Sequence, residues 1–201
     1  MKAYRSKSAR QSDGFSLIEV LVSMLILTGG LMALLSVLGI MMAATQTSQQ
    51  DLVARQLASE AMESIFNARN TSQVGFSAIA NTTANPPGIF LPNALPLKCA
   101  GADGILDTAD DAPCLTASGA TCPNGGIECL TEPGPDGILG TADDVIISLN
   151  NYTRTVTITP LLENGNVDPT LVQVQITMNY TVPNSGHTKS YTLIDYISQY
   201  H

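Results

Sequence analysis

A long apolar run near the N-terminus constrains this chain more than any other feature. It covers Gly14–Ala44 and carries a single charge, Glu19. No charged residue follows from Val20 to Gln50, and about 20 consecutive apolar residues are enough to cross a bilayer as a helix. The sequence therefore predicts a membrane-spanning helix at the start of the chain.

A short basic arm, residues 1–14, precedes the apolar run. Bases beside an apolar segment favour keeping that arm in the cytoplasm while the rest is translocated. A secretory signal peptide would end its apolar region at a small-residue cleavage site, and no such site follows Ala44. We therefore expect the apolar helix to be kept and the arm to be removed. The bases of the arm are Lys2, Arg5, Lys7 and Arg10.

The junction between arm and apolar run resembles the processing motif of type IV prepilins and type II secretion pseudopilins. The residues that carry this resemblance are Gly14-Phe15-Ser16-Leu17-Ile18-Glu19. The resemblance implies that a membrane prepilin peptidase cuts between Gly14 and Phe15 and methylates Phe15. The first half of the chain is most similar to PilV-type minor pilins, which have GF[ST]LIEVLV, an apolar run, and then a helix similar to Leu57-Ala58-Ser59-Glu60-Ala61 here.

Glu19 is an acid in a segment that should lie in lipid. A carboxylate inside a bilayer costs roughly 2.5–3.5 kcal/mol on insertion scales, and less near a helix end, so it usually has a partner. Cleavage would create an amine at Phe15, one helical turn away. The resemblance implies that Glu19 meets the amine of a neighbouring subunit, which would fix the register of packed helices. The alternative is a carboxylate that reaches the headgroups.

The net charge argues against a nucleic-acid partner. The chain has a formal net charge of −8, which becomes −11 when the four bases and one acid of the arm are removed. Sequence-independent binding to nucleic acid relies on Lys and Arg that neutralise phosphate. We therefore predict no nucleic acid among the partners.

Helical periodicity continues after the apolar run to about Asn67. Apolar residues recur at helical spacing and predict a stripe that packs on a soluble domain. The stripe consists of Val53, Leu57, Ala61 and Ile65, widened by Leu52, Ala58, Met62 and Phe66.

From Val145 the apolar period changes to two, which predicts strands. They are expected at Tyr152–Thr159, at Leu171–Pro183 and near Thr188–Ile197, with turn signals at Glu163-Asn164-Gly165-Asn166 and Asn184-Ser185-Gly186. One face of the second strand is apolar: Val172, Val174, Ile176, Met178, Tyr180 and Val182.

Such a sheet needs a cover for its apolar face, and the helical stripe is the available candidate. The predicted fold class is α+β: a long N-terminal transmembrane and spine α-helix packed on a C-terminal antiparallel β-sheet, with a long acidic, cysteine-containing loop. This order of elements along the chain, a stem helix followed by a loop and then an antiparallel sheet, is that of the type IV pilin fold. The expected segments are a cleaved leader at 1–14, a hydrophobic stem at 15–44, an amphipathic spine at 45–67, a loop region at 68–144 and the sheet at 145–201.

Four cysteines lie within the loop region, and their even number in an exported domain favours two disulfides over zinc or thiol chemistry. Three connectivities exist. We favour Cys99–Cys114 and Cys122–Cys129 because each closes a short local loop.

The loop region also contains an internal repeat. The eleven residues from Gly101, GADGILDTADD, return from Gly134 as GPDGILGTADD, with nine positions identical. Carboxylates beside a glycine turn suit Ca²⁺, which takes six to eight oxygens, and the repeats resemble the Asp-rich loops of thrombospondin-type and dockerin-like proteins. The alternative is a pair of solvated acidic turns. Nothing apolar is expected around these acids. The candidate ligands are Asp103, Asp107, Asp110, Asp111, Asp136, Asp143 and Asp144.

Catalysis is not expected. The two histidines are His187, in a predicted turn, and His201 at the end of the sequence. No nucleophile motif, phosphate loop or dinucleotide fingerprint occurs.

The resemblance therefore predicts a minor pilin of a type IV pilus, with a type II secretion pseudopilin or an adhesin-like module that uses the acidic loop as alternatives. The implied partners are other pilins, met through the N-terminal helices, the prepilin peptidase and an inner-membrane assembly platform. The expected location is the inner membrane, as a single-pass protein with a periplasmic domain, and later the pilus or cell surface. The region Cys99–Asp144 departs from the pilin pattern, in which many members have one disulfide near the C-terminus.

Overall fold

The computed structural model describes residues 16–182 and 186–200. The chain divides into two units, Met1–Gln46 and Thr47–His201. Helix α1 (Leu17–Asn70) contributes to both, and its residues in the first unit are all exposed. The helix ends three residues beyond the expected end at Asn67, because Thr71 and Ser72 still donate backbone hydrogen bonds to Asn67 and Arg69.

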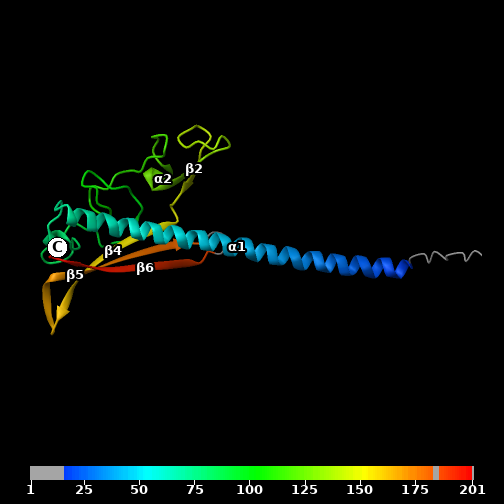
Figure 1. The fold of residues 1–201 in the computed structure, drawn as a ribbon, viewed down its shortest axis with the longest axis horizontal. Helices are drawn as coiled ribbons and strands as arrows, with labels where there is room; N and C mark the ends of the chain where they lie inside the picture. Colours follow the sequence, from blue (N-terminus) through cyan, green and yellow to red (C-terminus); the bar gives the residue numbers. More distant parts are fainter. Residues whose placement is uncertain (1–15, 183–185, 201) are drawn as a thin grey trace, which may run out of the picture. The chain divides into compact units, whose positions relative to one another are not determined.

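The second unit is built on a four-stranded antiparallel sheet with the order β1-β4-β5-β6 (Figure 1). Its strands are β1 (Leu95–Pro96), β4 (Tyr152–Glu163), β5 (Asn166–Thr181) and β6 (Thr188–Ser198). The three long strands were predicted, but β4 and β5 extend further towards the turn that joins them than expected. The register shifts in that extension, where Pro160 lies on β4 and Pro169 on β5. Regular pairing is interrupted there because proline cannot donate a hydrogen bond to the ladder.

The turn between β4 and β5 has the backbone that the sequence predicted. Asn164 and Gly165 have φ values of 51° and 84°. Two consecutive residues with positive φ are typical of the tight type I′ turn, which Asn-Gly favours. The second predicted turn lies partly outside the described residues, since 183–185 are not among them.

The predicted apolar face of β5 is buried. It packs in one core with α1, β4 and the loop residues Phe90, Leu97 and Ile105, and Figure 1 shows the second-unit part of α1 running along the sheet. The helical stripe is confirmed except at Leu52, which is 66 % exposed, and at Val53 and Phe66, which lie at the margin of the core. The sheet already contacts the helix at Gln50 and Asp51, which accept from Tyr152 and Tyr180, so the exposure of Leu52 reflects its side of the helix and not its position along it. The buried helix residues are Ala54, Leu57, Ala58, Ala61, Met62, Ile65 and Ala68.

The region expected to be a loop contains short elements that attach it to the core. These are a 3₁₀ turn η1 (Phe76–Ala78), a single turn α2 (Pro123–Gly126) and strand β2 (Cys129–Glu132). β2 pairs with β3 (Val145–Ser148), which begins the segment expected to be the sheet but forms a separate two-stranded sheet. Asn81 holds the region against β4, because its amide donates to the Val156 carbonyl and accepts from the Ile158 amide, both at 2.8 Å.

Candidate functional site

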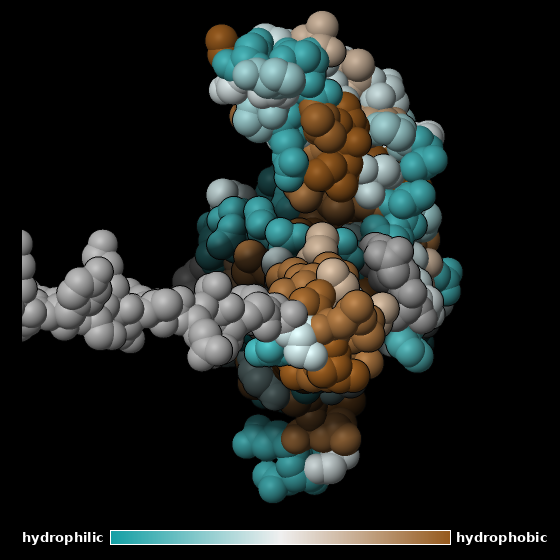
Figure 2. Space-filling model, turned by 90° about the vertical axis from the view of Figure 1, so that its right-hand side faces the viewer, coloured by the Kyte–Doolittle hydropathy of each residue, from teal (hydrophilic) through white to brown (hydrophobic). Residues whose placement is uncertain are grey.

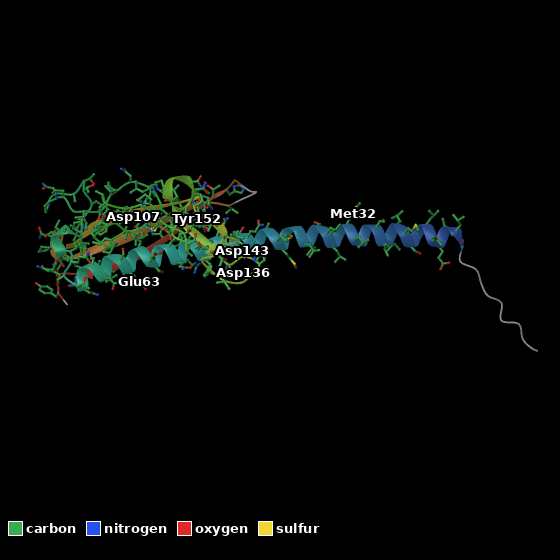
Figure 3. The ribbon with its side chains drawn as sticks, turned by 90° about the horizontal axis from the view of Figure 1, so that it is seen from above. Met32, Glu63, Asp107, Asp136, Asp143 and Tyr152 are labelled. Atoms are coloured by element: carbon green, nitrogen blue, oxygen red, sulfur yellow. A yellow bond between two sulfur atoms is a disulfide. The ribbon has the colours of Figure 1, made fainter. Side chains whose placement is uncertain are left out.

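The N-terminal half of α1 has the properties of a membrane and assembly helix. Among the described residues, α1 is long and apolar enough to cross a membrane. Its large apolar side chains are exposed, for example Met32 at 73 % (Figure 3). Glu19 is the charged side chain described in this half, in the first turn of the helix. The cleavage residues Gly14 and Phe15 and the four bases of the arm lie outside the described residues.

The first repeat, residues 101–111, is a loop closed by its own carboxylates. The side chain of Asp110 accepts from the Asp103 amide at 3.2 Å and from the Thr108 hydroxyl at 2.7 Å. Asp103 accepts from the Ile105 amide at 2.9 Å, and Asp111 accepts from the backbone amide of position 107 at 2.9 Å. These acids therefore act first as acceptors for the loop's backbone. The bond from Thr108 lowers the pKa of Asp110.

The second repeat, residues 134–144, reproduces this geometry. Asp143 accepts from the Asp136 amide at 3.3 Å and from the Thr141 hydroxyl at 2.7 Å, and Figure 3 shows Asp136 and Asp143 close together. Asp136 accepts from the Ile138 amide at 2.8 Å, and Asp144 accepts from the Gly140 amide at 2.7 Å. The bond from Thr141 lowers the pKa of Asp143. The sequence repeat is thus a structural repeat.

The first glycine of each repeat is required by close backbone packing. A Cβ added at Gly101 would lie 2.1 Å from the Asp110 carbonyl oxygen, and one at Gly134 would lie 2.2 Å from the Asp143 carbonyl oxygen. Each loop therefore closes on a position that has no room for a side chain.

The two repeats differ in what covers them. In the first repeat Ile105 and Leu106 are buried at 1 % and 6 % exposure, whereas their counterparts Ile138 and Leu139 are 60 % and 56 % exposed. The expectation that nothing apolar surrounds the acids is therefore wrong for the first repeat. Its isoleucine and leucine are buried in the domain core, and the acid that follows them in sequence is buried as well.

That neighbouring acid, Asp107, forms a buried ion pair with Arg154 of β4. The distance from Arg154 Nε to Asp107 Oδ2 is 2.6 Å, and the two side chains are 0 % and 4 % exposed. Burial raises the pKa of Asp107, and the Arg154 charge opposes that rise. Arg154 Nη1 and Nη2 are buried without a hydrogen-bond partner among the described residues. Asp107, expected as a calcium ligand, is thus engaged by an arginine.

Glu128 lies beside this pair in a small cavity of about 140 Å³ that Glu60, Ser64 and Leu106 also line. Burial raises the pKa of Glu128 to about 7, and the Glu60 charge adds to that rise while Arg154 opposes it. The first repeat therefore lies beside Glu128, a carboxyl group whose pKa is raised to about 7.

The cysteines form the disulfides Cys99–Cys114 and Cys122–Cys129. These are the two short pairings that the spacing favoured. The first bridge encloses the whole first repeat, while the second repeat lies beyond both bridges.

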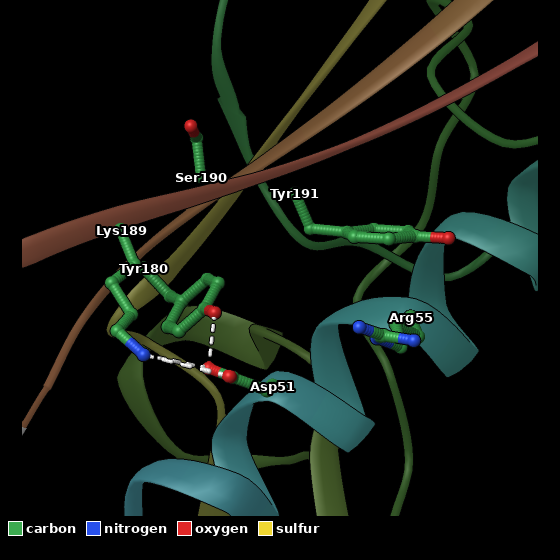
Figure 4. Close-up of a pocket in the computed structure, with 6 residues that line it drawn as sticks. All are labelled: Asp51, Arg55, Tyr180, Lys189, Ser190 and Tyr191. Atoms are coloured by element: carbon green, nitrogen blue, oxygen red, sulfur yellow. Dashed lines mark hydrogen bonds and ion pairs between the residues drawn. The ribbon is translucent and has the colours of Figure 1, made fainter.

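A groove lined by residues of α1, β5 and β6 holds two cations and two tyrosines (Figure 4). Asp51 accepts from the Tyr180 hydroxyl at 2.5 Å and pairs with Lys189 at 3.3 Å. The Tyr180 bond lowers the pKa of Asp51, and Lys189 lowers it further. The Arg55 guanidinium stacks over the Tyr191 ring, 5.3 Å from its centroid. We call this surface the cationic groove; it is lined by Asp51, Arg55, Tyr180, Lys189, Ser190 and Tyr191.

The structure does not gather the candidate ligands into one metal centre. Within residues 16–182 and 186–200, no group of three or more His, Cys, Asp or Glu side chains could hold a metal ion. The candidates are divided between the two repeats, where they bond backbone amides and threonine hydroxyls. Calcium therefore stays a prediction.

Sequence reasoning missed Arg154 and Asn81. Arg154 stands in a strand of alternating β-branched residues, at a position that points to the core, and a buried arginine there requires a buried acid. That signal was present in the sequence, but it did not indicate which acid. Asn81 carries no comparable signal, since asparagine in a loop is usually exposed.

A comparison with known protein families identifies the N-terminal segment. Residues 9–28 match the family described as the prokaryotic N-terminal methylation motif. No curated protein and no solved structure matches the chain. The motif, the apolar helix and the antiparallel sheet with its disulfides fit the α+β pilin fold with a membrane anchor. The motif supports a type IV pilin-like protein, of the pilin or pseudopilin kind. The motif implies processing by prepilin peptidase and assembly with other pilins, and its family is structural rather than enzymatic.

Proposed function

We propose that the chain is a minor pilin that is assembled into, or primes, a type IV pilus. The observation that carries this proposal is the N-terminal half of α1, an exposed apolar helix with one acid, Glu19, immediately after a prepilin processing motif. A lone exposed apolar helix of this length is covered by lipid before assembly and by the helices of other subunits afterwards. The loop region, which departs from the pilin pattern, suits a specialised rather than a bulk subunit.

Glu19 is the proposed assembly residue. Cleavage after Gly14 leaves the amine of Phe15 as the new N-terminus, and a charged amine and a carboxylate attract strongly where water is excluded. Apolar contacts alone do not fix the register of helices in lipid, because lipid is as apolar as the partner helix. We infer that Glu19 pairs with the amine of a neighbouring subunit during entry into the filament.

We propose that the second unit lies in the periplasm before assembly and at the pilus or cell surface afterwards. Its two disulfides support this location, since structural disulfides form in oxidising compartments. The bases of the arm support a cytoplasmic N-terminus. An inner-membrane assembly platform is the proposed partner for extraction from the bilayer.

The assignment is tested by the mature N-terminus and by filament entry. Mass spectrometry should find methylated Phe15 as the first residue, and sheared filaments should contain the protein. Glu19→Ala should lower its amount in filaments at least tenfold without lowering its amount in membranes, and Glu19→Asp should retain part of the activity. A first residue of Met1 in cells with an active prepilin peptidase would contradict the proposal.

A type II secretion pseudopilin is the second proposal, because the same motif serves both kinds of subunit. Deletion of the gene separates them. A minor pilin should affect surface filaments and leave exoprotein release unchanged, whereas a pseudopilin should cause exoproteins to accumulate in the periplasm.

An adhesin-like role is the third proposal, supported by the exposed second repeat. Removal of residues 134–144 from the full chain should abolish attachment to a surface while leaving filament number unchanged. Loss of filaments together with attachment would instead assign the loop to assembly.

We propose Ca²⁺ as a ligand of the second repeat. The support is Asp144, whose Oδ1 is buried without a hydrogen-bond partner in the described part of the chain, together with the exposed acids Asp136 and Asp143. In the first repeat Asp107 is engaged by Arg154, so Asp103, Asp110 and Asp111 remain as candidates there. EDTA should lower the melting temperature of the purified full chain, and Ca²⁺ should restore it. An unchanged melt, with no calcium in the protein, would remove this proposal.

We infer that the chain is not an enzyme. The structural nature of its motif family supports this, and so does the use of its acids as acceptors for loop amides. A pilin role predicts no turnover that depends on any one of these acids.

A further inference from the structure

The two-stranded sheet of β2 and β3 and the second repeat carry exposed apolar side chains. In β2 and β3, Leu130 and Ile147 lie directly opposite each other and share a face with Val145. Figure 2 shows apolar surface in this upper part of the molecule. A two-stranded sheet is only marginally stable by itself and gains stability when its apolar face is covered. We call this surface the loop patch; its residues are Leu130, Ile138, Leu139, Val145 and Ile147, all 37 % exposed or more.

The first repeat shows how such a loop docks. Its Ile105 and Leu106 enter the core, and the next residue, Asp107, pairs with Arg154. The loop thus presents an Ile-Leu pair flanked by carboxylates to a surface that offers apolar contact and a cation. The second repeat keeps most of these internal bonds and the same apolar pair, with Gly140 in place of Asp107. Within the described residues, Ile138 and Leu139 are exposed.

The acids around the loop patch define the charge of its partner. Glu132, Asp136 and Asp143 are exposed there, and no lysine or arginine lies within residues 129–148. A partner surface must therefore be cationic as well as apolar, since opposite charges steer the encounter and fix its register.

The described part of the chain offers one surface of that kind. It contains five Lys and Arg residues. Arg154 is buried, Lys98 donates to the Gly125 carbonyl, and Arg69 donates to the carbonyls of Ser198 and Tyr200. The remaining two cations, Arg55 and Lys189, are exposed and both line the cationic groove, where Arg55 stacks on Tyr191 and Lys189 pairs with Asp51.

The cationic groove also suits the apolar part of the loop. Its volume of about 320 Å³ is on the order of ten liquid-water volumes, which leaves room for aliphatic side chains against the partly buried Tyr191. Tyr180 is 3 % exposed and stacks on Tyr152, so it forms the floor of the groove. In the cation–ring pair, the Arg55 side chain is exposed and the Tyr191 side chain is partly buried.

We propose that the second repeat of one subunit docks in the cationic groove of a second copy of this chain. Ile138 and Leu139 contact the Tyr191 ring, and the acids of the loop face Arg55 and Lys189. Because the two surfaces differ, the contact is heterologous. The contact goes beyond the proposed pilus role and is measurable in a protein that never enters a filament.

The test uses a zero-length carbodiimide, which joins a carboxylate to an amine only when the two touch. The full chain in detergent micelles is prepared as a mixture of ¹⁴N and ¹⁵N protein. Mixed-label peptides should link Lys189 to the loop carboxylates Glu132, Asp136 or Asp143. The link from Lys189 to Asp51 within one chain, 3.3 Å apart, is the internal positive control. A sample in which only this same-label link forms overturns the proposal.

Matched variants separate docking from general association of the apolar helices. Ile138→Ser with Leu139→Ser should lower the yield of mixed-label links about tenfold, and Arg55→Glu should lower it to a similar extent. Leu162→Ser, at another exposed apolar position (66 %), should leave the yield unchanged. Mixed-label links that persist in the double variant, or that use Lys98 in place of Lys189, also overturn the proposal. Processing at Gly14 and filament entry are scored separately, so failure here leaves the pilin assignment in place.

Discussion

The two repeats carry nearly the same eleven residues and form the same loop, yet one is part of the core and the other is exposed. Most internal bonds match, and so does the glycine that leaves no room for a Cβ. The first repeat has three further bonds, from Thr108 to Asp103 and Asp111, that Thr141 does not make in the second. Local sequence therefore determines the loop geometry. Burial is determined elsewhere in the chain.

The residue that decides burial is Arg154 in β4. It sits on the core face of the sheet, and it requires an acid that the first repeat supplies through Asp107. The second repeat has Gly140 at that position, with φ of 89°, where Asp107 also has a positive φ of 62°. The backbone requirement is thus common to both loops, and the carboxylate is the difference.

Exchanging these two residues should give the largest effect. Asp107→Gly keeps the positive φ but leaves Arg154 buried without an acid, which typically costs about 3–5 kcal/mol of unfolding free energy. Gly140→Asp, the reciprocal change, faces solvent and should cost about 1 kcal/mol or less. Chemical denaturation of the full chain measures both. Equal losses would show that the pair does not hold the first repeat.

Truncating the apolar pairs should give the next largest effect. Leu106→Ala removes a buried side chain and should cost about 2–4 kcal/mol. Leu139→Ala removes an exposed one and should change the free energy of unfolding by less than about 0.5 kcal/mol. A melt in which Leu139→Ala is as destabilised as Leu106→Ala would contradict the difference in burial.

The glycines test whether closure of each loop matters to the whole domain. Gly101→Ala and Gly134→Ala place a Cβ against a backbone oxygen in both loops, a clash that typically costs about 1–3 kcal/mol. For Gly101→Ala the loss should appear in global unfolding. For Gly134→Ala hydrogen exchange should rise within residues 134–144 only, because this loop can open without exposing the core.

Glu128 makes the seat of the first repeat sensitive to pH. Its pKa in the folded protein is about 7, above its unfolded value near 4.3. The folded state therefore holds the proton more tightly, so stability is highest below the unfolded pKa and falls as pH rises to about 7. Glu128→Gln should match the wild type at pH 4.5 and exceed it at pH 8 by about 1–2 kcal/mol, a range reduced for partial exposure. Melting temperatures at the two pH values measure this difference.

The fold was predictable where periodicity is strong. The alternation along β5 and the stripe through Leu57, Ala61 and Ile65 each have one geometry that buries them, and the structure contains both. The turn at Asn164 and Gly165 was equally determined, because few residue pairs accept positive φ twice.

The site was predictable only in part. The processing motif and Glu19 were evident, since an acid in an apolar run has few explanations. The repeats were found, but not which one is buried, because that depends on Arg154, which lies 47 residues from Asp107 in sequence. Pairings at such a distance are set by the packing of the whole domain, which periodicity does not encode.

Because the Cys99–Cys114 disulfide encloses only the first repeat, proteolytic cleavage in the two repeats has different consequences. A protease that nicks the first repeat leaves both fragments tied together by sulfur, and the protein migrates as one band until it is reduced. A nick in the second repeat falls outside both rings. It would free the segment that holds the three long strands from the anchor, with only non-covalent packing left to retain it.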